Sequence, residues 1–155
     1  MLYIRKIKIF LIACLLLPVN AAILLASELH SKNTIDTSNS VTNFVTPSGN
    51  TYCALVGTEK NALRCEIRSM LNPLPPQPYS GYCKFDWGAG FLLNQRRKPK
   101  ILCISDTIGG SSQTLSYGST WTRSGFKCVS KIIGLTCHNS SGYGFFISRN
   151  RWRVF

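Results

Sequence analysis

The stretch NTYCALVGTEKNALRCEI, residues 50–67, decides the fold class. Two short apolar runs, Asn50–Val56 and Ala62–Ile67, flank a polar five-residue turn, which is typical of a β-hairpin. When the ends of the two runs pair across the turn, Cys53 stands directly opposite Cys65. Directly opposed strand positions have the short separation that a disulfide requires. The stretch therefore predicts a disulfide-bonded hairpin.

The rest of the chain from residue 44 onward repeats this pattern, and no part of it has a convincing helical period. Further strands are expected at Gly90–Asn94, Ile101–Ser105, Lys127–Lys131, Gly134–His138, Tyr143–Ser148 and Trp152–Phe155. A hairpin over 127–138 would place Cys128 opposite Cys137. Short strands divided by frequent turns predict an all-β fold, a small disulfide-stabilised antiparallel sandwich or barrel built from hairpins.

Residues 1–26 resemble an export signal. Three cations, Arg5, Lys6 and Lys8, precede an apolar run, and small residues follow as far as Ala26. Cleavage after Ala26 would make the protein secreted or periplasmic. An uncleaved membrane anchor is the alternative, because Ile9–Ala26 is about long enough to span a bilayer.

Leu11–Cys14 matches a lipoprotein cleavage box, but the apolar run before Cys14 is shorter than the about 7 residues such a signal needs. Residues 27–43 are polar and predict a flexible linker. The disulfide-bonded β-domain is then expected at 44–155.

Removal of the signal lowers the cysteine count from seven to six. The six are Cys53, Cys65, Cys83, Cys103, Cys128 and Cys137. An even set in an exported chain predicts a disulfide framework, and Cys83–Cys103 follows by elimination once both hairpin bridges form. Zinc is the competing interpretation, but no C-x2-C pair occurs and His138 is the only histidine of the domain. No metal and no cofactor are expected.

The chain is strongly basic, with 18 Lys and Arg against 6 Asp and Glu. Loss of the three cations of the signal leaves a net charge of about +9. Such a charge favours association with polyanions or anionic surfaces, although a solvated basic surface that binds nothing is the plain alternative.

Catalytic residues are few. His138 follows a cysteine expected to be bridged, and no nucleophile motif accompanies it. The domain has only four carboxylates, Glu59, Glu66, Asp86 and Asp106. We expect Glu66 to pair with Arg64 or Arg68, and Asp86 and Asp106 to cap turns. The sequence therefore predicts that the protein is not an enzyme.

Two basic clusters are candidate anion-binding sites. Arg96, Arg97, Lys98 and Lys100 lie at the predicted tip of the hairpin over 90–105. Arg151 and Arg153 would share one face of the last strand, with Trp152 on the other. Trp152 is expected to be core rather than a stacking platform. The proline-rich loop Asn72–Tyr79 is a candidate inhibitory loop.

The ordered motifs resemble a family of small secreted bacterial proteins catalogued as domain of unknown function 6636. The matching segments are Phe44–Asn50, Cys53–Leu55, Arg64–Ile67, Asp86–Gly88, Cys103–Asp106, Leu115–Gly118, Gly134–Cys137, Gly142–Phe145 and Ser148–Arg149. The family often has histidine where this chain has Tyr143. The resemblance implies export and an all-β disulfide domain, and no activity.

Together these features predict an exported, non-enzymatic binding module for an anionic or envelope-associated partner, such as an anionic polymer, the envelope surface or an extracellular protein. A small secreted hydrolase, nuclease-like, and a periplasmic enzyme inhibitor are the alternatives. A hydrolase should gather its carboxylates or His138 in one pocket, whereas a binding module should present a basic surface patch.

Overall fold

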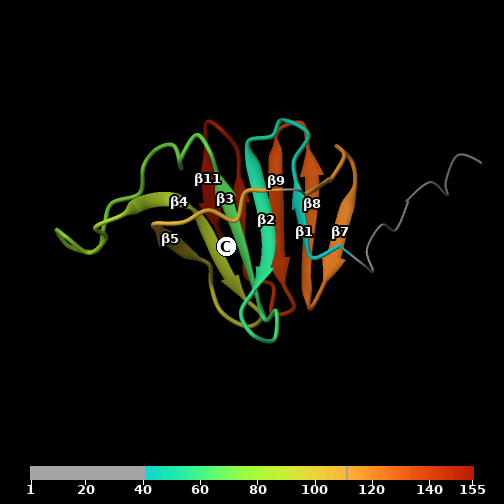
Figure 1. Ribbon diagram of the computed structural model, residues 1–155, viewed down its shortest axis with the longest axis horizontal. Coiled ribbons are helices and arrows are strands. Elements are labelled where there is room, and N and C mark those ends of the chain that lie inside the picture. Colours follow the sequence, from blue (N-terminus) through green and yellow to red (C-terminus); the bar gives the residue numbers. More distant parts are fainter. Residues whose placement is uncertain (1–40, 111) are drawn as a thin grey trace, which may run out of the picture. The chain divides into compact units, whose positions relative to one another are not determined.

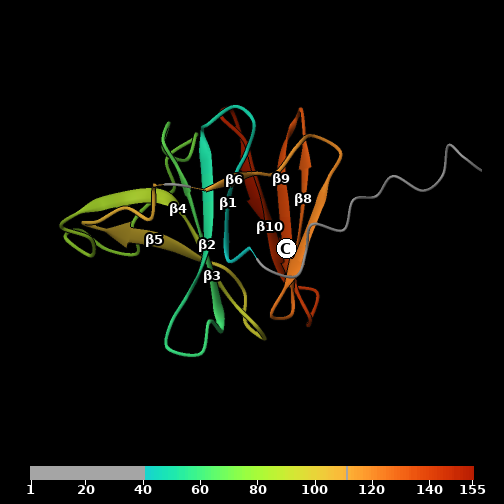
Figure 2. The same cartoon turned by 45° about the vertical axis from the view of Figure 1, so that its right-hand side comes forward.

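The computed structural model of the protein describes residues 41–110 and 112–155, which fold into two β-sheets that face each other (Figures 1 and 2). The predicted signal peptide, and the linker as far as residue 40, lie outside the described residues. No helix occurs in the described part of the chain, so it contains no helical segment long and apolar enough to cross a membrane.

Sheet A has six strands in the order β5-β4-β3-β2-β1-β6, and sheet B has five in the order β11-β10-β9-β8-β7. Sheet A consists of β1 (Asn43–Val45), β2 (Thr51–Val56), β3 (Ala62–Ile67), β4 (Asp86–Asn94), β5 (Lys100–Ile104) and β6 (Gln113–Thr114). Sheet B consists of β7 (Thr120–Arg123), β8 (Phe126–Lys131), β9 (Gly134–Asn139), β10 (Gly144–Ile147) and β11 (Trp152–Val154). The neighbours are antiparallel except β1 and β6, which pair in parallel. The expected all-β, sandwich-like fold is confirmed.

Alternation of burial along the strands builds the core between the sheets. In β2 and β9 every second residue is buried, which is the period that a strand with one covered face requires. Aromatic side chains join the two layers. Phe91 of β4 stacks on Phe145 of β10 with ring centroids 4.8 Å apart, and Phe44 of β1 packs against Trp121 of β7 at 5.1 Å.

The three predicted disulfides are present: Cys53–Cys65, Cys83–Cys103 and Cys128–Cys137. The first and third cross directly between paired strands, as the hairpin registers predict. Each closes a short loop and should contribute about 3 kcal/mol in the chain-entropy model. The sulfurs of Cys53, Cys65 and Cys137 lie within 4.8 Å of one another in the core, but all three are bonded in disulfides, which offer no thiolate to a metal.

Of the strands that the sequence predicts, β4 departs most from expectation, because it begins at Asp86 rather than at Gly90. Strands β1, β6 and β7 were not predicted. A bulge interrupts its pairing with β5 between Trp87 and Phe91. Gly90 lies in this bulge with φ +143°, and a Cβ there would lie 2.0 Å from the carbonyl oxygen of Cys65. A glycine inside a strand marks such a close approach of two backbones. Asp86 is therefore the first residue of a strand and not the predicted turn cap.

Candidate functional site

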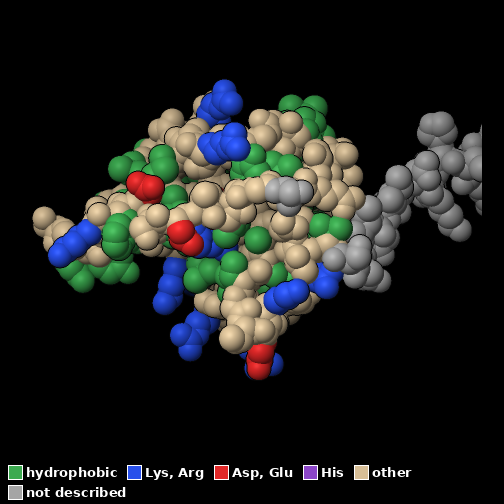
Figure 3. Space-filling model, in the orientation of Figure 1, with side chains coloured by type: hydrophobic (Ala, Val, Ile, Leu, Met, Phe, Trp, Pro, Cys, Tyr) green, Lys and Arg blue, Asp and Glu red, His purple; other side chains and the backbone are tan. Residues whose placement is uncertain are grey.

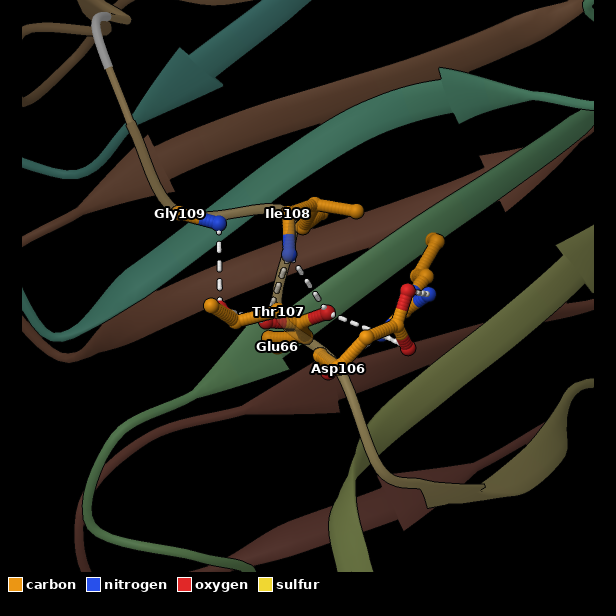
Figure 4. Close-up of polar contacts among 6 residues, drawn as sticks. Glu66, Asp106, Thr107, Ile108 and Gly109 are labelled. Atoms are coloured by element: carbon orange, nitrogen blue, oxygen red, sulfur yellow. Dashed lines mark hydrogen bonds and ion pairs between the residues drawn. The ribbon is translucent and has the colours of Figure 1, made fainter.

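The segment after β5 crosses the outer face of sheet A to reach β6 (Figure 1). Glu66 of β3, only 7% exposed, fastens this crossing segment. Its carboxylate accepts a hydrogen bond from the Thr107 hydroxyl at 2.7 Å and from the Ile108 backbone N–H at 3.1 Å (Figure 4). The Thr107 hydroxyl in turn accepts from the Gly109 N–H at 3.0 Å. The buried carboxylate thus orders a stretch of irregular chain that has no strand partner there.

Arg64 of β3 contacts both Glu66 and Asp106, and the three residues form an ion-pair cluster. Its guanidinium lies 2.6 Å from a Glu66 oxygen and 3.0 Å from a carboxylate oxygen of Asp106, and it also donates to the Asp106 backbone carbonyl at 2.9 Å. The hydrogen bond and the positive charge of Arg64 hold the pKa of Asp106 below its usual value. The predicted pairing of Glu66 with Arg64 is confirmed. Asp106, expected only to cap a turn, is instead the second acid of this ion-pair cluster.

A depression of about 540 Å³ lies beside this cluster. Glu66, Asp86 and Asp106 line it, together with Tyr52 and Arg68. Figure 3 shows acidic side chains in view on the face that the crossing segment covers. This is the gathering of carboxylates that the hydrolase alternative requires. The oxygens of Glu66 are nevertheless occupied by Arg64, Thr107 and Ile108, and Asp106 is paired, so the depression lacks the two free carboxylates of a glycosidase pair.

His138 lies on the other sheet from the cluster of Arg64, Glu66 and Asp106. It belongs to the outer face of β9 in sheet B, between Lys127 of β8 and Gly144 of β10. The four carboxylates of the described residues all precede residue 107, in sheet A and its connections. Within the part of the chain that the structure describes, sheet B therefore offers His138 no Asp or Glu side chain to orient it as a general base.

The predicted hairpin tip, Arg96, Arg97, Lys98 and Lys100, has four exposed side chains, but its backbone is docked on sheet B. Asn139, 2% exposed, donates from its amide nitrogen to the carbonyls of Asn94 at 2.8 Å and Arg97 at 3.0 Å. The Ser140 hydroxyl donates to the Gln95 carbonyl at 3.1 Å. We call these four cations the basic tip. It is held in place by the turn between β9 and β10 rather than projecting freely.

Arg151 and Arg153 lie on the outer face of sheet B, each over an aromatic ring. The Arg153 guanidinium lies 5.5 Å from the centre of the Phe155 ring, and that of Arg151 lies 5.3 Å from the centre of the Phe146 ring. Such stacking restrains a long side chain and leaves its N–H donors free for an anion. Both arginines, with Lys131, line a depression of about 360 Å³.

Trp152 points to the other side of the strand, as expected. Its ring centroid lies 5.8 Å from that of Phe91, and its indole N–H donates to the Pro73 carbonyl at 2.6 Å. Trp152 is partly buried and packs against the core, and it also anchors the proline-rich loop.

Sequence reasoning missed two further cations of this surface, Lys127 and Lys131. Both alternate with buried residues along β8, so they face outward on the same side of sheet B as Arg153, and Lys131 lines a depression together with Arg151 and Arg153. The alternation of polar and apolar residues along 126–131 is the sequence signal that could have identified both lysines as outward-facing. We call Lys127, Lys131, Arg151 and Arg153 the basic face.

Two glycines of sheet B seat the aromatic rings. A Cβ at Gly134 would lie 2.7 Å from the Phe146 ring, and one at Gly144 would lie 2.7 Å from the Phe155 ring. The rings therefore lie flat against bare backbone, beneath the arginines. A side chain at either glycine would lift the ring and its arginine from the sheet.

The basic tip and the basic face meet near Tyr143. The Lys98 ammonium lies 6.0 Å from the centre of the Tyr143 ring. The next residue, Gly144, supports the Phe155 ring that carries Arg153. Arg153 and Phe146 are direct partners across β10 and β11. The two predicted clusters thus lie at neighbouring positions of the chain, Tyr143 in the turn before β10 and Gly144 in β10.

The proline-rich loop is fixed at several points but exposes large side chains. The indole N–H of Trp87 donates to the Pro75 carbonyl at 2.7 Å, and the Cys83–Cys103 disulfide closes the segment. Tyr79, the last residue of the loop, is 65% exposed, and Phe85, just beyond the loop, is 64% exposed. The inhibitor alternative stays a prediction.

The fold and the charge layout define a small, disulfide-bonded all-β domain with one basic sheet face. Residues 22–155 match the family model described as Family of unknown function (DUF6636), so the chain belongs to this family. No curated protein and no solved structure matches the chain. The family assignment agrees with the resemblance found in the sequence, and it assigns no activity.

Proposed function

We propose that the protein is a non-enzymatic binding module that holds an anionic partner against the basic face of sheet B. The absence of Asp and Glu from the described residues of sheet B is the observation that supports this proposal. Within the described residues, every Asp and Glu lies between Glu59 and Asp106. Residues 112–155 contain six Lys and Arg, namely Arg123, Lys127, Lys131, Arg149, Arg151 and Arg153, and no acidic residue.

Among the described residues, sheet B contains no Asp or Glu side chain that could neutralise Lys127, Lys131, Arg151 and Arg153. A net positive face attracts polyanions and speeds their association, and the two ring-stacked guanidiniums suit phosphate, sulfate or carboxylate groups. The basic tip, joined to this face through Lys98 and Tyr143, would lengthen the contact with an extended anion. The protein would act after export through its signal peptide, at or near the bacterial envelope. Three disulfides suit such an oxidising compartment.

Elution from immobilised heparin tests the proposal with variants of nearly matched charge. The face variant carries Gln at Lys127, Lys131, Arg151 and Arg153, and the tip variant carries Gln at Arg96, Arg97, Lys98 and Lys100. The control variant carries Gln at three cations elsewhere, Lys60, Arg68 and Lys84. We expect the face variant to elute at the lowest salt concentration, the tip variant next, and the control near the wild type.

The order of elution distinguishes a site from mere net charge. At about 0.15 M salt the Debye length is about 8 Å, so only cations close to the anion contribute strongly. If the control variant elutes as early as the face variant, binding follows net charge alone and the proposed site is wrong. Unchanged melting temperatures would exclude unfolding as the cause of earlier elution.

A further inference from the structure

The turn between β8 and β9 exposes two adjacent isoleucines at the edge of the basic face. Ile132 is 84% exposed and Ile133 62% exposed. Lys131 and Gly134 pair at the base of this turn, so the isoleucines occupy its two central positions. Neither isoleucine has a positive φ, so this turn is not of the type whose backbone requires glycine, asparagine or aspartate. Polar residues would serve the turn equally well, so the exposure of two adjacent apolar side chains needs another cause.

Cations surround this isoleucine tip on both sides. Ile132 and Ile133 line a depression of about 200 Å³ together with Lys131 and Arg149. Ile133 also lines the depression of about 360 Å³ that contains Arg151 and Arg153. The apolar tip thus stands inside a collar of four cations, Lys131, Arg149, Arg151 and Arg153.

The collar is also firmly held. Arg149 and Arg151 lie in the turn between β10 and β11, which Ser148 closes. The Ser148 backbone N–H donates to the Arg151 carbonyl at 2.9 Å, and the Ser148 hydroxyl donates to the same carbonyl at 3.0 Å. The disulfide Cys128–Cys137 ties the two strands that present the isoleucines. Rigid presentation lowers the entropy lost when a surface is bound.

We propose that this end of sheet B docks on an anionic lipid bilayer, with Ile132 and Ile133 inserted among the acyl chains and the collar on the lipid phosphates. The inference rests on the proposed function, because it names the anionic partner of the basic face. Apolar insertion and cationic attraction reinforce each other at such a surface. A soluble polyanion would engage the collar but would give the isoleucines no apolar phase. A protein groove would need acidic walls around an apolar floor, whereas an anionic bilayer has this layering everywhere.

Vesicle co-sedimentation tests the inference with the full chain. Binding to vesicles of phosphatidylcholine with about 30% phosphatidylglycerol is compared with binding to vesicles of pure phosphatidylcholine. The anionic lipid gives the first vesicles a strong negative surface potential. The test variant carries both Ile132→Ser and Ile133→Ser. Phe85→Ser is the control, because Phe85 is an apolar residue of similar exposure in a different loop. All proteins share the same N-terminal residues, so differences among them report the substituted side chains. Heparin elution is measured on the same samples.

We expect the wild type to bind the anionic vesicles at least about tenfold more tightly than the isoleucine double variant. Phe85→Ser should bind like the wild type, and all three proteins should elute from heparin together. In an Ile132→Trp variant, lipids brominated in their acyl chains should quench the added fluorescence, because the side chain enters the bilayer.

The other possible results each contradict either the lipid inference alone or the proposed function as well. Equal vesicle binding by wild type and double variant, or no quenching of the added tryptophan, overturns the lipid inference and leaves the anion-binding proposal in place. Heparin binding without vesicle binding does the same. Equal binding to neutral and anionic vesicles also overturns the inference, because the collar would then have no role. Failure of the wild type on both heparin and vesicles overturns the proposed function as well.

Discussion

Asn139→Asp should destabilise the domain severely at neutral pH, because the Asn139 amide nitrogen joins sheet B to the hairpin of sheet A while its oxygen fixes the turn between β9 and β10. Its nitrogen donates to the carbonyls of Asn94 and Arg97, and its oxygen accepts from the backbone N–H groups of Ser141 and Tyr143, each at 3.0 Å. Aspartate keeps the two accepting bonds but turns an oxygen toward the two carbonyls. The change therefore loses two hydrogen bonds and buries an uncompensated charge.

The magnitude follows from that count. Each lost hydrogen bond costs about 1 kcal/mol, and each buried carbonyl left without a donor costs at least about another 1 kcal/mol. The expected loss is about 4 kcal/mol of unfolding free energy, equivalent to a fall of roughly 15 °C in melting temperature. Asn150→Asp, at an exposed position of the turn between β10 and β11, is the matched control and should change stability by less than about 0.5 kcal/mol.

Urea unfolding followed by tryptophan fluorescence measures both variants at pH 7 and pH 4.5. Burial beside two carbonyls should raise the pKa of the new carboxyl in the folded state above its unfolded value. The folded variant then takes up a proton more readily than the unfolded one, so its deficit should shrink as the pH falls. A deficit below about 1 kcal/mol at pH 7, or one that grows toward pH 4.5, would refute this account of Asn139.

Other predictions concern the framework and the outer face of sheet A. Thiol titration of the denatured, unreduced chain from residue 27 onward should find no free thiol, and peptide mapping should find no crossed disulfide. Gly90→Ala should cost more than about 3 kcal/mol because its Cβ would meet the Cys65 carbonyl, whereas Gly110→Ala, with open space around it, should be nearly neutral. Asp106→Asn should lower the free energy of unfolding at pH 7, because the pKa of Asp106 is depressed in the folded state. The stability that the ionised Asp106 contributes is fully present above the unfolded-state pKa and is lost as the pH falls through the folded-state pKa. The stabilities of wild type and variant should therefore converge in acid. His138→Ala should leave any hydrolytic rate within about threefold, whereas loss of a general base costs about 100-fold or more.

The hairpins could be predicted from the sequence because their information is local. The period-two alternation and the opposed cysteines of 50–67 fix both the strands and their register. Strand β7 was missed because Trp121 is its only large apolar residue, so no alternation was visible. The bulge in β4 is set by the close approach of Gly90 to Cys65, a contact between different strands that no local pattern records.

The candidate site likewise combines features that the local sequence predicts with features that depend on contacts between strands. The basic residues Arg151 and Arg153 could be placed on one face of a strand from spacing alone. Arg151 lies on the Phe146 ring and Arg153 on the Phe155 ring, and these rings rest on Gly134 and Gly144. This stacking depends on the register between the consecutive strands β9, β10 and β11, which the spacing within one strand does not record. The role of Glu66 likewise depends on a segment about forty residues later crossing its face.

An NMR titration tests whether the basic face of sheet B binds anions, because it reports every backbone amide at once. A short sulfated oligosaccharide is added to isotopically labelled protein at about 0.15 M salt, near physiological ionic strength. We expect chemical-shift changes that concentrate on the outward-facing residues of β8 to β11 and on the basic tip, with Lys127, Lys131 and Arg153 among the largest. The depression around Glu66 should remain unshifted. Shifts centred on Glu66, Asp86 and Arg68 instead, or spread evenly over both sheets, would contradict the claim that the basic face is the binding site.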